Sequence, residues 1–586
     1  MAKGSNDDCQ TVDLMGMDQA LLQISYLSSG SSNGNQSDVG QLSLWTQSSE
    51  CYECPMVRQC QWTMDKSAQL LVDTKYSTLL VVRNGTNHLC GLTKHFGEHG
   101  TYNLTIHGNV ECQIEEIFKA ENSFLPILYV FIVYVILWLF YYGAVLGRQH
   151  WKQRRAVALG SEQGHQSGAS DPVDSVAPSQ EVKATPAPAK KARLRSLDTF
   201  RGISIVIMIF VNLGGGGYYF FEHSVWNGLT VADLVFPWFM YIMGTSMYLA
   251  INGAARKQMS LPSIWLNIVR RSIILFLLGL FLNGQNNNWK TLRILGVLQR
   301  FGITYFIVGS FLCIRILRTR RHGSQDSVTD LSLFADIKAI WVEWTLESLL
   351  ILVYACITFL LTIPGCPRGY LGPGGLGDNG RYPLCTGGAA GYVDEVILTS
   401  KHTYGWPTCK QIYQATVNFD PEGILSQLTA SLTVFLGLQA GVTLVTFSSH
   451  RARLVRWAVW ALVCGLVGGF LCTFSKNGGW IPVNKNLWSL SYVFTLGAMS
   501  FTLLSLLYIV IDVKQYWQGA PFYQAGMNSI VLFMAHECFG GYLPFSWQPL
   551  AVPLTHAAQM AMNAWATSLF VVLAIYLHYR RIFISV

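Results

Sequence analysis

Charged side chains are scarce in this sequence. Asp, Glu, Lys and Arg make up 13% of the 586 residues, about half of the usual share, whereas 51% of the residues are hydrophobic. This apolar content excludes a disordered chain, and the lack of any internal repeat excludes a fibrous one. A soluble enzyme would have to hide an improbable number of uniformly apolar helices. The composition therefore predicts a polytopic α-helical membrane protein.

Several enzyme motifs are also missing. The sequence has neither a Gly-x-Ser-x-Gly motif nor a Walker motif, which removes the usual support for a hydrolase or an ATP-driven pump. His536-Glu537 lacks the second histidine of a metalloprotease helix, and Cys51-x-x-Cys54 lacks a second cysteine pair at zinc spacing. We therefore expect no metal, and we expect a structural disulfide role for Cys51 and Cys54, with their pairing left open.

Apolar segments recur along the chain, and roughly 20 apolar residues are enough to cross a bilayer. Gly214 to Gly217 interrupt one of these segments, and Asp233 and Pro237 lie within the next, so these two are the least regular. Irregular backbone at membrane depth is tolerated only beside protein or a cavity. We predict eleven spans, at approximately 124–147, 200–217, 229–251, 264–283, 294–317, 338–363, 423–446, 454–475, 487–512, 521–543 and 560–579.

Residues 1–123 have a different character. Short runs of alternating apolar and polar residues, separated by turn residues, predict a small β-rich, sandwich-like domain. Six of the 14 cysteines lie here, together with the three glycosylation sequons of the chain, at Asn35, Asn84 and Asn103. Both features belong in an oxidising secretory lumen. Because residues 1–10 are polar and acidic, we expect that a leader peptide has been removed.

The basic residues predict the orientation of the spans. The net charge is +8, and the charged residues flank the apolar segments and form no stripe. They therefore indicate membrane orientation and not a nucleic-acid partner. With residues 1–123 in the lumen, the segments expected in the cytosol are the richer ones in Lys and Arg. We predict a luminal N-terminus, a cytosolic C-terminus, a disordered cytosolic linker at 148–199 and a ten-helix domain at 200–586.

Residues 364–422, between the sixth and seventh predicted spans, form the one long luminal loop after the first span. It carries Cys366, Cys385 and Cys409. Two of these cysteines can pair, and the third is either free or bridges to another subunit. We expect a homodimer, and such a bridge is one way to link it covalently.

The strongest candidate site lies where the second predicted span meets the third. Asn212 lies inside the second span, four glycines follow, and His223 falls in a short aromatic hairpin before Asp233 enters the third span. Polar groups at membrane depth are costly and by default mark a functional path. The glycines would let a ligand or another helix approach the backbone. The competing interpretation is that His223 is an ordinary hydrogen-bonded surface residue.

Basic residues mark two further positions. Arg195 and Arg201 lie at the predicted cytosolic end of the second span, where they either set the topology or hold the phosphates of a cytosolic cofactor. Gln299 and Arg300 lie inside the fifth span. They either pair with an acidic residue, Asp233 or Glu347, or shape a polar tunnel. These features fit a transporter, and they fit equally a transferase that takes its donor from one side and its acceptor from the other.

Several long motifs lie within about 190–586. They are Leu194-Arg-Ser-Leu-Asp-Thr-Phe-Arg-Gly202, Trp226-Asn-Gly-Leu-Thr-Val-Ala-Asp-Leu-Val-Phe-Pro-Trp-Phe239, Pro364-Gly-Cys-Pro, Thr386-Gly-Gly-Ala-Ala-Gly-Tyr392, Phe419-Asp-Pro-Glu-Gly423 and Pro482-Val-Asn-Lys-Asn-Leu-Trp-Ser-Leu-Ser-Tyr492. These motifs resemble the heparan-α-glucosaminide N-acetyltransferase family of lysosomal membrane enzymes. The N-terminal domain matches this family more loosely, through its cysteines and sequons.

The resemblance implies transfer of an acetyl group from cytosolic acetyl-CoA to the terminal glucosamine of heparan sulfate in the lysosomal lumen. It places the active-site histidine at His223 and the family's asparagine at Asn212. We expect Trp226 and Asp233 to contact the acceptor, and Arg195, Arg201, Gln299 and Arg300 to contact the donor. His223 either accepts the acetyl group covalently or acts as a general base for direct attack by the amine. We favour direct transfer, because it needs no stable acetyl-imidazole beside luminal water.

Overall fold

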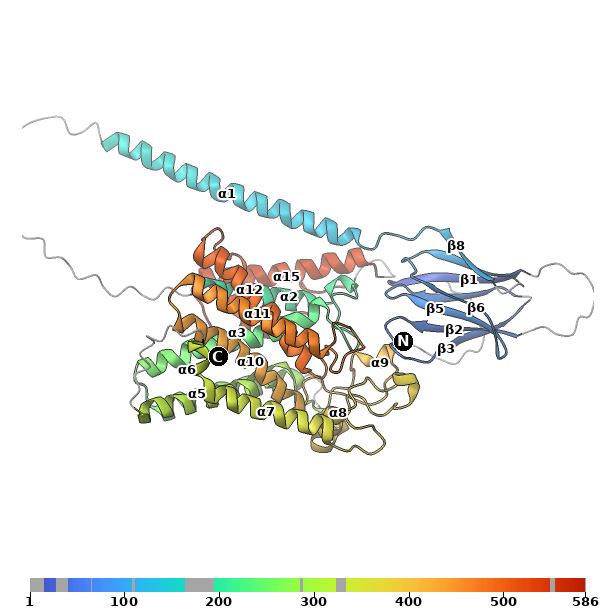
Figure 1. Cartoon of the computed structure of the whole chain (residues 1–586). Coiled ribbons are helices and arrows are strands. Elements are labelled where there is room, and N and C mark those ends of the chain that lie inside the picture. The colour runs from blue at the N-terminus through green and yellow to red at the C-terminus, as the bar shows by residue number, and fades with distance from the viewer. Residues whose placement is uncertain are drawn as a thin grey trace, which may run out of the picture. The chain divides into compact units, whose positions relative to one another are not determined.

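The computed structural model describes residues 15–27, 41–64, 66–107, 111–163, 194–284, 288–322, 334–548 and 554–584 (Figure 1). The chain divides into two compact units. One unit is Ser123–Leu194, and the other combines Met1–Asn122 with Arg195–Val586. The larger unit begins with strands, drawn in blue, and continues with a helical bundle (Figure 1).

The strands form a β-sandwich. In the residues described, one sheet has the order β4-β1-β7-β8 and the other the order β3-β2-β5-β6. Alternate residues face inward, such as Leu22 and Ile24 of β1 and Leu42 and Leu44 of β2, and they share one buried cluster. The predicted β-rich domain is confirmed. Its strands are β1 (Gln19–Leu27), β2 (Gln41–Ser48), β3 (Val57–Thr63), β4 (Ala68–Asp73), β5 (Thr78–Asn84), β6 (Asn87–Lys94), β7 (Thr101–His107) and β8 (Glu111–Phe118).

Disulfides brace this strand domain. Cys90 of β6 bonds to Cys112 of β8, which ties one sheet to the other. Cys51 bonds to Cys54 in the turn after β2, and Cys60 is disulfide-bonded as well. The structural disulfide role predicted for Cys51 and Cys54 is confirmed, and the structure supplies the pairing that the sequence left open.

The long loop at 364–422 contains a further disulfide. Cys366 pairs with Cys385, and Cys409 keeps a free thiol. Cys409 is 0% exposed and packs in a buried cluster with Val225 and Trp226. A disulfide to another subunit through Cys409 would therefore require this side chain to leave its cluster.

Within the described residues, nine helices are long and apolar enough to cross a membrane. Each coincides with one of the eleven predicted spans, and the polytopic helical class is confirmed. They are α1 (Leu125–Gln163), α3 (Val231–Arg256), α4 (Leu261–Asn283), α5 (Val297–His322), α7 (Trp341–Leu360), α10 (Ile424–Thr446), α11 (His450–Leu471), α12 (Leu490–Leu507, continued by a π-helical turn to Val513) and α15 (His556–Tyr579).

The other two predicted spans have less regular helices. α2 (Arg195–Asn212) carries charged residues in its first two turns, which lower its hydropathy. The predicted span at 521–543 is divided between α13 (Phe522–Met527) and α14 (Ser529–Phe539), because Asn528 departs from helical geometry. Short helices lie between the spans: α6 (Ala335–Ala339), α8 (Ala389–Leu398) and α9 (Cys409–Ile412).

The smaller unit contains α1. Its apolar part is Leu125–Arg148, and the helix continues to Gln163, into the segment predicted as a linker. Residues 149–163 are rich in Arg, Gln and Ala and contain no Pro, so they favour a helix. Residues 164–193, the greater part of the predicted linker, lie outside the described residues.

Glycines bring two pairs of helices into backbone contact. A Cβ atom on Gly244 of α3 would lie 1.9 Å from a carbonyl oxygen of α10, and one on Gly437 of α10 would lie 1.8 Å from a carbonyl oxygen of α3. Gly202 of α2 and Gly526 of α13 are related in the same reciprocal way. Helices in lipid associate through close packing of this kind, because lipid tails are as apolar as the side chains.

The strand domain contacts one end of the helical bundle, which we call the strand-domain end. The helix-side partners all lie in loops or at helix ends that the sequence predicts to be luminal. The contacting pairs are Asp18 with His556, Glu50 with Lys476, Glu53 with Asn379 and Lys75 with Glu222.

Candidate active site

The segment between α2 and α3 begins with the glycine run. Gly214 to Gly217 have positive φ values, from +56° to +115°, a conformation that strains residues with a side chain. A Cβ atom at Gly214 or Gly216 would also collide with Gln559 or Met560 of α15. Of the two partners expected from the sequence, a ligand or a helix, the structure shows a helix against these glycines.

His223 is hydrogen-bonded to a fully buried carboxylate. Its Nδ1 lies 2.8 Å from Oδ1 of Asp233, whose side chain is 0% exposed. The other oxygen of Asp233 accepts hydrogen bonds from the backbone N–H groups of Ser224 and Thr230 and from the Thr230 hydroxyl, at the first turn of α3. Asp233 is therefore held rigidly, and it fixes the Nδ1 side of the imidazole. The His223 side chain is 37% exposed.

Lys485 lies against the same imidazole. Its Nζ is 3.0 Å from Nδ1 and 3.1 Å from Nε2 of His223, and 3.9 Å from Oδ1 of Asp233. Burial lowers the pKa of Lys485, and the charges of Asp233 and Glu422 offset this only in part. Lys485 is not among the site residues predicted from the sequence, and it lies 262 positions from His223. The available signal was a lysine just before a predicted span.

A buried ionic network lies behind Lys485. Arg293 donates to both oxygens of Asp420, at 2.9 and 2.6 Å, and to Glu422 at 2.5 Å. Burial raises the pKa of Glu422, but the charges of Arg293, Arg300 and Lys485 more than offset this, so the pKa lies below its ordinary value. Glu422 therefore keeps a negative charge that stabilises the nearby cations.

Gln299 and Arg300 are buried at the start of α5, at the strand-domain end. Arg300 donates to the carbonyl oxygen of Pro421 and to the Ser426 hydroxyl, and its guanidinium lies 4.4 Å from the centre of the Trp488 ring. Gln299 packs against Gly279 of α4. In the described part of the chain, Arg300 forms no ion pair with either of the expected acids, Asp233 or Glu347.

Asn212 belongs to a different cluster from His223. Its Nδ2 lies 3.0 Å from Nε2 of His536 and 3.4 Å from Oε1 of Glu537, both on α14. His536 is 4% exposed. The structure thus brings Asn212 together with His536-Glu537 of the tenth predicted span, and not with His223 of the hairpin.

Arg195 and Arg201 lie at the far end of α2 from the hairpin. Arg201 donates to Asp198 at 3.3 Å and to the Ser246 hydroxyl at 2.8 Å. The Arg195 guanidinium lies 5.6 Å from the centre of the Tyr523 ring. The structure thus separates the four residues predicted to contact the donor, because Gln299 and Arg300 lie at the strand-domain end.

Trp226 is a packing residue in this structure. It is 1% exposed, its Nε1 donates to the carbonyl oxygen of Leu371, and its ring meets Phe419 edge-on. It therefore attaches the hairpin to the loop 364–422. Of the sequons, Asn84 ends β5 and Asn103 lies on β7, whereas Asn35 lies outside the described residues.

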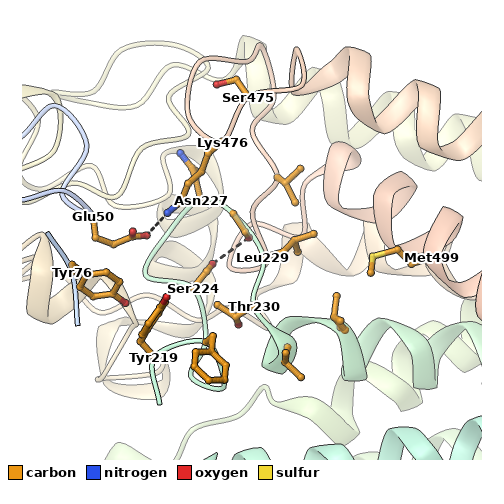
Figure 2. Close-up of a pocket in the computed structure, with 15 residues that line it drawn as sticks. Glu50, Tyr76, Tyr219, Ser224, Asn227, Leu229, Thr230, Ser475, Lys476 and Met499 are labelled. Atoms are coloured by element: carbon orange, nitrogen blue, oxygen red, sulfur yellow. Dashed lines mark hydrogen bonds and ion pairs between the residues drawn. The ribbon is translucent and has the colours of Figure 1, made fainter. Parts of the chain in front are cut away.

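A cavity of about 660 Å³ adjoins the hairpin (Figure 2). Tyr219, Ser224 and Thr230 line it from the hairpin, and Glu50 and Tyr76 line it from the strand domain. Ser224 and Thr230 are also the residues that bind Asp233, so the cavity lies beside the His223–Asp233 pair. Its volume is within the range of small-molecule sites. Among the described residues, no group of three or more His, Cys, Asp or Glu side chains could hold a metal ion.

Comparison with known proteins identifies the family of this chain. No protein-family model matches the chain. The heparan-alpha-glucosaminide N-acetyltransferase of Mus musculus is 37% identical over 98% of this chain and 90% of its own length. The Homo sapiens enzyme of the same name is 37% identical over 97% of this chain and 88% of its own length. This chain therefore belongs to the heparan-alpha-glucosaminide N-acetyltransferase family of membrane acyltransferases.

Proposed function

We propose that this chain transfers the acetyl group of acetyl-CoA to the terminal glucosamine amine of heparan sulfate, and that His223 performs the proton transfer. The names of the relatives support the reaction and the acceptor. The observation that carries the assignment of the site is the exposed His223 imidazole, held by buried Asp233 beside a cavity.

The proton step follows from this geometry. When the acceptor amine attacks the acetyl carbonyl, a C–N bond forms, the C–S bond breaks and CoA leaves as a thiolate. The amine loses a proton, which His223 accepts at Nε2 because Asp233 occupies Nδ1. Lys485, 3.1 Å from Nε2 and with a lowered pKa, is positioned to take this proton onward.

Acetyl-CoA supplies a reactive thioester, so the protein has to bind, orient and shield it. We assign Arg195 and Arg201, at the predicted cytosolic end of α2, to the phosphate groups, which guanidinium groups bind through paired hydrogen bonds. Gln299 and Arg300 are fully enclosed at the opposite end. A donor contact there would be to the acetyl end of the molecule and not to its phosphates.

A covalent route through acetyl-His223 is the alternative. Labelled acetyl-CoA added without acceptor separates the two routes. Direct transfer predicts no labelled protein and no release of free CoA. Labelled His223 that passes its acetyl group to added glucosamine would establish the covalent route instead.

We also propose that the protein is a homodimer of the lysosomal membrane with a luminal N-terminus. The sequons support this orientation, and so does the contact of the strand domain with the predicted luminal loops. The burial of Cys409 argues for a dimer without a disulfide through that residue.

Sealed vesicles test the function itself. Labelled acetyl-CoA outside and glucosamine inside should yield N-acetylglucosamine inside, while free CoA stays outside. Uptake of intact acetyl-CoA without product would favour a transporter.

A further inference from the structure

A second cavity lies next to the active-site hairpin. It measures about 350 Å³, and its walls are formed by the strand domain, the loop 364–422, the hairpin and the loop before α12. Asn227 of the hairpin lines both cavities, and the segment 475–483 contributes residues to both. A ligand longer than one sugar could therefore extend across Asn227 from one cavity to the other.

The polar groups at this junction are already ordered. Asn227 donates to Asn477 at 3.1 Å and accepts from Asn484 at 3.1 Å. Asp378, the carboxylate in the wall, accepts a hydrogen bond from the Tyr370 hydroxyl at 2.6 Å. The floor of the cavity is thus preorganised, and a ligand would bind without ordering these groups.

Arg368 is the basic residue of this wall. Its side chain is exposed, and no hydrogen-bond or ion-pair partner for it exists in the described residues. The backbone close to Arg368 is restrained, because Cys366, two residues earlier, is bonded to Cys385. An exposed guanidinium without a partner, carried on a restrained backbone, is well suited to bind a carboxylate through two parallel hydrogen bonds.

Aromatic side chains are exposed at the same cavity. Trp480 is 81% exposed and Tyr52 is 43% exposed, and both line the cavity. Their flat apolar faces suit the C–H faces of a sugar ring, while the neighbouring amides suit its hydroxyls.

We propose that this cavity binds the sugar that follows the terminal glucosamine, a uronic acid whose carboxylate pairs with Arg368. This inference rests on the proposed function, since it adds a second subsite to the same acceptor site. The cavity would make an oligosaccharide a better acceptor than free glucosamine. Arg368 would act in binding and would leave the chemical step unchanged.

The test compares two acceptors, free glucosamine and a disaccharide of glucosamine linked to a uronic acid. Arg368→Gln should lower kcat/KM for the disaccharide by roughly 10- to 100-fold, the effect of losing a charge-assisted hydrogen bond, and leave the value for glucosamine unchanged. Trp480→Ala should also act on the disaccharide alone. Arg381→Gln is the matched control, because Arg381 lies in the same loop, is exposed and does not line the cavity.

A chemical control removes the charge from the ligand. Reduction of the uronate carboxylate to an alcohol should weaken the wild-type preference for the disaccharide to the level of Arg368→Gln, so that wild type and variant become equal. Equal effects of Arg368→Gln on both acceptors, or no effect on either, would overturn the subsite. If the wild type acetylates neither acceptor, the proposed function itself fails, which is a different result.

Discussion

A carboxylate outside the predicted spans should make the stability of this protein depend on pH. Asp394 of α8 is 2% exposed; one of its oxygens accepts the backbone N–H of Ile424 at 2.8 Å, at the start of α10. The other oxygen lies only 1.9 Å from the position that a Cβ atom on Gly423 would take. Burial raises the pKa of Asp394 from 3.8 to about 7, with the nearby charge of Asp420 adding to the effect.

The sign follows from proton binding. The folded state holds this proton more tightly than the unfolded state, so stability falls as the pH rises from about 4 to about 7. Below that window both states are protonated, and above it the full penalty is present. A difference of about 3 pKa units at about 1.36 kcal/mol each gives on the order of 4 kcal/mol. The protein should therefore be more stable in an acidic compartment than at neutral pH, as far as this residue is concerned.

Asp394→Asn keeps the shape of the side chain and an acceptor for the Ile424 N–H, but it cannot titrate. Thermal unfolding of the purified protein between pH 4.5 and 8 should show that the variant loses less stability than the wild type as the pH rises. Other titrating groups cancel in this difference. Glu395→Gln is the control, because Glu395 is adjacent and exposed, and its curve should parallel the wild type. Parallel curves for Asp394→Asn as well would refute the argument.

Three further predictions concern the site and the topology. His223→Ala should lower turnover by at least roughly 100-fold with normal expression, and near-normal activity would transfer attention to His536. Arg195→Gln and Arg201→Gln should raise the KM for acetyl-CoA and leave the KM for glucosamine unchanged; unaltered kinetics in both variants would leave them with a topological role only. Glycosidase treatment should lower the apparent mass, and a variant that lacks the sequons at Asn35, Asn84 and Asn103 should show no change. A residual shift in that variant would place another loop in the lumen.

The sequence predicted features that depend on local pattern. Alternation over a few residues indicates a strand, and a long apolar run indicates a span, so the β-rich domain and the spanning helices follow from the local pattern. His223 and Asp233 are ten positions apart, and the sequence singled out both. The structure adds that Asp233 is fully buried and hydrogen-bonded to the imidazole. Burial of this kind depends on the packing of distant segments and is not encoded in the local sequence.

Pairings between distant segments could not be predicted in the same way. Lys485 reaches His223 only because the loop before α12 folds over the hairpin, and Asn212 meets His536 across 324 residues. Arg300 shows the same limit. A charge inside a span requires a partner, but the sequence offered several acids, and the partners present are a backbone carbonyl and a hydroxyl.

The reciprocal glycine contacts have a consequence for inherited variation. At Gly202, Gly244, Gly437 and Gly526 the space of a single methyl group is filled by the backbone of the facing helix, which cannot move aside as a side chain can. Even alanine, the mildest missense change, should separate the helices there. A saturation library selected for activity should thus lose every substitution of these four glycines. Gly253, with open space around its Cβ position, should tolerate many substitutions.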